Sequence, residues 1–217
     1  MSAILSPITT VELLCLTTAT VFLVKDKNLF WRNNIAYLIV VCLTEMVIGR
    51  YVSSKYHNNL WVFNIFVFFE ASFISYGIYH CLNKYTNAKV LLAIGTSIIY
   101  AFYFGFIIKN GILVFNQVVV SVMSVIFVLY CLYYYYLLLT SEEVPEISGN
   151  PEFWWLTAVL FYYFGSTTVN LFLKLFMSIK IGAFSIRYII LNVLNLILYG
   201  LWAYSFICRA KQRKSLS

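Results

Sequence analysis

Long uncharged runs of apolar residues, separated by short polar connectors, dominate the pattern of this sequence. Such runs predict membrane-spanning helices, because a helix needs about 20 predominantly apolar residues to cross a bilayer. We predict seven spans, at about 8–24, 35–53, 60–81, 90–108, 111–139, 153–173 and 188–208. The expected fold is an all-α polytopic membrane protein, a bundle of seven transmembrane helices forming one domain over residues 1–217 with no soluble domain.

Polar residues recur inside several of these runs at the spacing of one helix face. In the last run, steps of four and three residues place Tyr188, Asn192, Asn195, Tyr199 and Trp202 on one face. The strongest polar groups of the other runs are Glu12, Glu45, Glu70, Gln117, Asn170 and Lys174. Since ionisable groups within a membrane are costly, they usually face the bundle interior or a water-filled cavity.

The depth of these groups predicts where such a cavity lies. At a rise of about 1.5 Å per residue, most of them fall roughly 6–12 Å below the outer surface, and Glu70 about 15 Å below it. We therefore predict an outward-facing polar cavity, closed below by aromatic packing. Its expected ligand-binding residues are Glu45, Glu70, Gln117, Asn170, Lys174, Asn192 and Asn195.

Structural roles are the alternative for the same residues. Glu45 and Glu70 can pair across helices, and the two asparagines of the last run can bond neighbouring helices. The long stem of Lys174 can carry its charge to the interface. Glu12 is shallow enough for an interfacial position to be favoured.

Composition excludes a soluble protein of this size. The chain is 62% hydrophobic and 11% charged, against about 45–50% and about 25% in soluble domains. The net charge of +7 includes a basic tail directly after the last run, where anionic lipid headgroups are the expected partner rather than nucleic acid. We accordingly expect the lipid bilayer as a partner and no nucleic acid.

The basic residues also orient the bundle. Nine lysines and arginines fall in the connectors after the first and third runs and in the tail, against five on the opposite side. The positive-inside rule then predicts an external N-terminus and a cytoplasmic C-terminus in the cell (inner) membrane. The acidic loop around Glu142 and Glu146 weighs little in this rule.

Catalytic and metal motifs are missing from the pattern. The five cysteines show no metal-ligand spacing, and no Ser/His/Asp set or Gly-rich phosphate loop is present. We expect no metal, no cofactor and no enzymatic activity. No span contains proline, which disfavours the broken helices of many secondary transporters.

Three stretches carry a resemblance: NIFVFFE at Asn64 to Glu70, PEFWW at Pro151 to Trp155, and NVLNLILY at Asn192 to Tyr199. With them the chain resembles a family of small uncharacterised seven-span bacterial inner-membrane proteins. The resemblance implies a bacterial inner-membrane protein without assigned chemistry, and it transfers no functional residue.

The leading hypothesis is a receptor-like or sensory protein that binds a small ligand in the cavity and signals through a cytoplasmic or membrane protein partner. An excess of carboxylates over lysine favours a cationic ligand or protons. The alternatives are an accessory or structural subunit of a larger membrane complex, for example in bacterial defence or the envelope, and a small transporter or a channel formed by oligomers.

Overall fold

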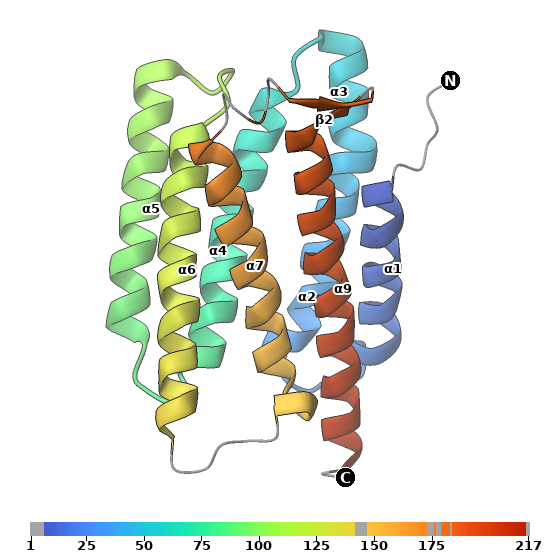
Figure 1. The fold of residues 1–217 in the computed structure, drawn as a ribbon, viewed down its shortest axis with the longest axis vertical. Coiled ribbons are helices and arrows are strands. Elements are labelled where there is room, and N and C mark those ends of the chain that lie inside the picture. Colours follow the sequence, from blue (N-terminus) through green and yellow to red (C-terminus); the bar gives the residue numbers. More distant parts are fainter. Residues whose placement is uncertain (1–6, 142–146, 173–175, 177–178, 183, 216–217) are drawn as a thin grey trace.

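Helices account for each of the apolar runs in the computed structural model, which describes residues 7–141, 147–172, 176, 179–182 and 184–215 (Figure 1). They are α1 (Pro7–Leu23), α2 (Leu29–Cys42), η1 (Leu43–Ile48), α3 (Gly49–Tyr56), α4 (Leu60–Leu82), α5 (Lys89–Asn110), α6 (Gln117–Thr140), α7 (Pro151–Leu171) and α9 (Ile186–Ser215). The segments α2, η1 and α3 form one continuous rod. A 3₁₀ turn, η2 (Ile147–Gly149), and a short antiparallel pair, β1 (Lys180–Ile181) with β2 (Phe184–Ser185), complete the described elements.

Five of these helical rods are long and apolar enough to cross a membrane: Leu29–Tyr56, α4, α5, α6 and α9. The all-α fold predicted from the sequence is thereby confirmed, and five of the seven predicted spans have the length and apolar composition that a multi-pass membrane protein needs. The rod α1 is shorter, because its 17 residues span only about 26 Å at the standard rise. The helix α7 is less apolar than these five rods. Most of its side chains are at least partly buried, so few of them would contact lipid.

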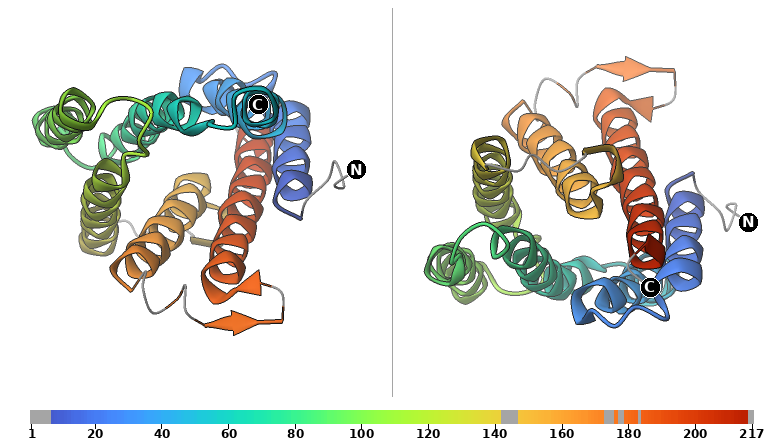
Figure 2. Two further views of the ribbon diagram at one scale, coloured as in Figure 1. Left: turned by 90° about the horizontal axis from the view of Figure 1, so that it is seen from above. Right: turned by 90° about the horizontal axis from the view of Figure 1, so that it is seen from below.

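The helices pack around a closed circuit. Neighbours along the chain contact one another from α1 to α9, and α9 packs against both α7 and α1. Viewed along the bundle, α5, α4 and α2 lie in one row and α6, α7 and α9 in a second, with α1 beside α9 (Figure 2). The described N-terminal end of α1 and the C-terminal end of α9 point to opposite ends of the bundle (Figure 1). We refer below to the N-terminal end and the C-terminal end of the bundle.

The connection between α5 and α6 differs from the expected span at 111–139. The helix begins only at Gln117, because Gly111 leaves α5 with a φ of 77°. The buried amide of Asn64 on α4 donates to the carbonyl oxygens of Ile112 (2.7 Å) and Val114 (2.8 Å) and accepts from the Asn116 N–H (2.9 Å). These three bonds satisfy backbone groups that a continuing helix would have paired internally. They hold the loop against the N-terminal end of α4.

Large aromatic side chains fill the bundle towards its C-terminal end. Trp155 on α7 stacks on Trp202 on α9 with ring centroids 5.5 Å apart, and its indole N–H donates to Asn34 (3.0 Å). Gly77 on α4 leaves the space that the Trp155 ring occupies. All five cysteines are free and buried, as expected for residues that serve packing. This layer is the aromatic packing expected beneath the polar groups.

Candidate ligand-binding cavity

Glu45 lies on a local departure from α-helical geometry. Residues Leu43–Ile48 form a π-helical turn between α2 and α3. Gly49 follows it, and a Cβ there would lie 2.8 Å from the Thr44 carbonyl oxygen and 3.3 Å from the Phe63 ring. A side chain at position 49 would therefore disrupt the turn. Such π turns shift the direction of the residues they carry and are frequent at functional sites.

Glu45 faces a cavity of about 190 Å³ between η1, α4, α6 and α7. Phenyl rings and aliphatic side chains form much of its wall, including Phe63 and Phe66 on α4 and Phe115 from the loop before α6. Its polar lining consists of Glu45, Glu70, Ser124, Tyr162, Tyr163 and Ser166. The cavity thus combines two carboxyl groups with hydroxyl groups inside a largely apolar enclosure.

Glu70 is held in place from the opposite side of this cavity. The hydroxyl of Tyr163 on α7 donates to Glu70 Oε1 at 2.7 Å. Tyr163 in turn packs edge-on against Phe127, with centroids 5.1 Å apart. One carboxyl oxygen of Glu70 is therefore anchored by a rigid aromatic donor, which fixes the direction of the group within the cavity.

The charge balance of the cavity is negative. Its described lining contains two glutamates and no lysine, arginine or histidine. The positive charge of Arg50, on α3, acts on Glu45 along the same rod. In a cavity with largely apolar walls, an ionised carboxylate is costly unless a cation or a proton compensates it. The geometry therefore favours a positively charged occupant.

Glu12 contradicts the interfacial position favoured from the sequence. Its side chain is 0% exposed, because α9 and α2 pack against α1 on either side. The carboxyl group of Glu45 and the hydroxyl of Tyr199 are polar groups that interact with it. Neither of its carboxyl oxygens has a well-oriented hydrogen-bond partner among the described residues. The sequence underestimated its depth because α1 begins lower in the bundle than its neighbours (Figure 1).

Four other predicted site residues, all within the described part of the chain, do not line this cavity. Gln117 is exposed at the start of α6. Asn192 and Asn195 donate to carbonyl oxygens one turn back on α9, those of Tyr188 (2.7 Å) and Leu191 (2.9 Å). Asn170 is half-buried near the end of α7.

Lys174 lies outside the described residues, so its predicted role stays a prediction. Of the seven predicted residues, Glu45 and Glu70 are the ones that the cavity brings together. Sequence analysis did not select the hydroxyl groups of Ser124, Tyr163 and Ser166, because nothing in their spacing ranks them above Asn192 or Asn195.

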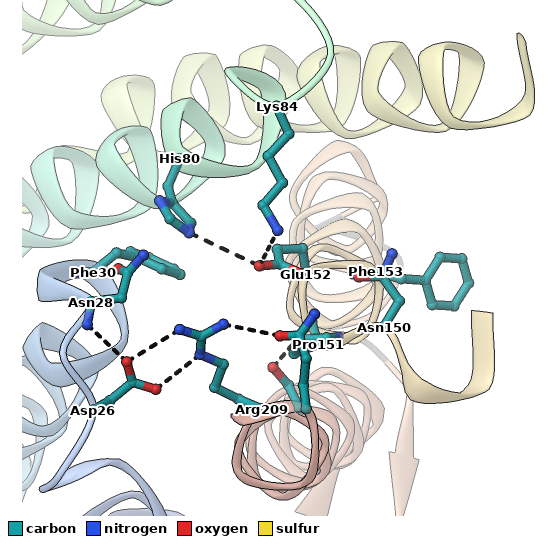
Figure 3. A network of polar contacts seen from close by, with 12 residues as sticks. Asp26, Asn28, Phe30, His80, Lys84, Asn150, Pro151, Glu152, Phe153 and Arg209 are labelled. Atoms are coloured by element: carbon teal, nitrogen blue, oxygen red, sulfur yellow. Dashed lines mark hydrogen bonds and ion pairs between the residues drawn. The ribbon is translucent and has the colours of Figure 1, made fainter. Parts of the chain in front are cut away.

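A second polar cluster lies at the C-terminal end of the bundle (Figure 3). Asp26, in the loop after α1, accepts from the Arg209 guanidinium on α9 through Nε (2.8 Å) and Nη2 (3.2 Å), and from the Asn28 N–H (2.8 Å). Arg213 Nη1 lies 3.8 Å from the same carboxylate. Burial raises the pKa of Asp26, but the hydrogen bonds from Arg209 and Asn28 and the two arginine charges outweigh it, so the pKa lies below its ordinary value.

Glu152 forms the other half of this cluster. It follows Pro151 in the first turn of α7, where a negative charge suits the helix dipole. Lys84, just after α4, lies 2.6 Å from Glu152 Oε1, and His80 Nε2 lies 4.0 Å from the same atom. The His80 ring stacks on Phe30 with centroids 4.5 Å apart. The cluster therefore ties α4 to α7 and the loop after α1 to α9, and sequence analysis missed it because its partners are distant along the chain.

Comparison with known proteins finds no matching family, no similar curated protein and no similar solved structure. The resemblance to small seven-span bacterial proteins accordingly stays a prediction.

Proposed function

We propose that the protein is a receptor-like membrane sensor that binds a small cation in the cavity between Glu45 and Glu70. The observation that carries the proposal is that these two carboxyl groups line the same small, largely apolar cavity. Carboxylates in a poorly solvated site gain most from a ligand that brings the opposite charge. The phenyl walls add contacts for a short apolar chain or for the ammonium group itself.

The size of the cavity limits the ligand. A volume of about 190 Å³ corresponds to roughly six water molecules at about 30 Å³ each, and it is smaller than the roughly 300–1,000 Å³ of pockets for drug-sized ligands. We therefore propose a primary or methylated amine of about six non-hydrogen atoms or fewer. One carboxylate pairs with the ammonium group, and Tyr162 or Ser166 provides a further polar contact.

The proposed topology has seven membrane crossings, an external N-terminus and a cytoplasmic C-terminus in a bacterial inner membrane. It is supported by the excess of basic residues, nine against five, at the C-terminal end of the bundle. The cavity wall includes Phe115 from a loop at the opposite end. In this topology the ligand reaches the cavity from outside.

The signalling part of the proposal rests on α9. This helix carries Tyr199 beside Glu12 and, three turns further on, Arg209 in the cluster with Asp26. A cleft of about 660 Å³ adjoins that cluster, with Lys84, Tyr204 and Lys211 among its lining residues. A change at the cavity that moves α9 would alter this cleft, where we propose that a cytoplasmic partner binds.

A thermal-shift experiment in detergent tests the proposed ligand class. n-Butylammonium should raise the unfolding temperature of the protein, whereas n-butanol and butyrate at the same concentration should not. The Glu45→Gln and Glu70→Gln variants should lose the shift, and Gln117→Ala, which alters an exposed residue, should retain it. An equal shift with n-butanol, or an unchanged shift in both glutamate variants, would reject the cation site.

A further inference from the structure

Glu12 and Glu45 form a carboxyl pair from two different helices, and only one member lines the cavity. Glu45 belongs to the cavity wall, whereas Glu12 on α1 is 0% exposed and lies beside the Glu45 carboxyl group. Neither oxygen of Glu12 has a well-oriented hydrogen-bond partner among the described residues. A fully buried, unsatisfied acid that interacts with a second acid needs a chemical explanation.

Repulsion between two ionised carboxylates provides that explanation. At short range and low dielectric constant, two like charges cannot both persist, and such pairs retain one proton between them. The groups that interact with the pair come from the surrounding helices: Cys15 on α1, Tyr37 and Cys42 on α2, Arg50 on α3, Glu70 on α4, Tyr162 on α7 and Tyr199 on α9. Among the described residues of this set, Arg50 is the cation, and its charge acts on Glu45. Within the part of the chain that the structure describes, this single positive charge cannot balance all three glutamates.

We propose that Glu12 and Glu45 share one proton, and that a cation binding at Glu45 displaces this proton to solvent. This inference rests on the proposed function. It adds that ligand binding and proton release are coupled in a single exchange. Before binding, the proton bridges the two carboxyl groups. After binding, the ligand's positive charge takes its place, so the net charge of the buried site is unchanged.

The exchange also explains the position of the π turn. Glu45 lines the cavity and also interacts with Glu12 on α1, a helix that packs against α2. The wider π turn at Leu43–Ile48 changes the direction of the Glu45 side chain relative to a regular helix. Gly49 makes that turn sterically allowed.

Calorimetric titration of n-butylammonium into the full-length protein tests the exchange. Titrations at one pH in two buffers with different ionisation enthalpies count the protons released. We expect close to one proton per bound ligand, and an apparent Kd that rises about tenfold for each pH unit below the titration of the pair. In Glu12→Gln the amide donates to Glu45 in place of the proton, so proton release and the pH dependence of the Kd should both disappear.

Two results would overturn the exchange while leaving the cation site intact: binding with no proton released by the wild type, or unchanged proton release in Glu12→Gln. Infrared spectroscopy tests the shared proton without any ligand. The wild type should show a protonated carboxyl C=O band that shifts in ²H₂O and is lost in Glu12→Gln and Glu45→Gln. Absence of that band from the wild type near neutral pH would reject the proton-sharing pair even if n-butylammonium fails to bind.

Discussion

Removal of the Asp26 charge should destabilise the protein by an amount that the geometry of the pair allows us to bound. The Asp26 carboxyl group is 1% exposed and the Arg209 side chain 18% exposed, with Nε and Oδ2 2.8 Å apart. Breaking a fully buried pair costs about 3–5 kcal/mol, whereas exposed pairs contribute about 0–1 kcal/mol. We therefore expect Asp26→Asn to lower the free energy of unfolding by about 2–4 kcal/mol, since the guanidinium retains some access to solvent.

The assay is SDS-induced unfolding in dodecyl maltoside micelles, arranged as a double-mutant cycle. The variants are Asp26→Asn, Arg209→Gln and the combination of both, and we expect a coupling energy of about 2 kcal/mol. Lys211→Gln is the matched control, because it removes one positive charge from an exposed position on the same helix and should change stability by less than about 0.5 kcal/mol. A coupling energy indistinguishable from zero would refute the reasoning.

The pH dependence of the free energy of unfolding provides a second test of the Asp26–Arg209 pair. Because the folded-state pKa of Asp26 lies below its ordinary value, the pair contributes its full stability above the unfolded pKa of about 3.9. That contribution declines as the pH falls through the lower, folded-state pKa. The stability difference between wild type and Asp26→Asn should therefore be constant from pH 7 to about pH 5 and shrink below about pH 4. A difference that persists unchanged in stronger acid would contradict the assigned cause.

Two further substitutions test the packing of the bundle. Gly77→Ala should destabilise by about 1–3 kcal/mol, because its Cβ would lie within 2.7 Å of the Trp155 ring, while Gly200→Ala, with no atom near its Cβ, should be neutral in the same unfolding assay. Asn64→Ala should cost about 2–4 kcal/mol by leaving backbone groups of the α5–α6 loop without partners, whereas Asn110→Ala removes one exposed bond of 3.2 Å within α5 and should have little effect. Similar unfolding free energies for either variant and its control would count against the described packing.

The helices could be predicted from the sequence because each is marked by a local pattern. An apolar run that spans a bilayer must be helical, since its backbone groups have no other partners in lipid. The start of α6 was placed too early because Gly111 to Asn116 is as apolar as a span, and only the distant Asn64 turns it into a loop. The burial of most α7 side chains likewise depends on tertiary packing.

The candidate site was predictable only in part. Glu45 and Glu70 stood out because carboxyl groups deep in a span are costly. The side-chain bonds of Asn192 and Asn195 to their own helix, and the interaction of Glu12 with Glu45, could not be predicted from the sequence, because both depend on helix rotation and relative height. The π turn at Glu45 is equally invisible to a pattern that assumes 3.6 residues per turn.

Calorimetric titration of n-butylammonium at neutral pH into the protein reconstituted in lipid nanodiscs is the most direct test of the cation site. Our account predicts saturable binding at one site per chain for the wild type, and no measurable binding to the Glu45→Gln/Glu70→Gln double variant that still unfolds cooperatively. Undiminished binding by that double variant, or no binding by the wild type to any small amine that fits the cavity, would contradict it.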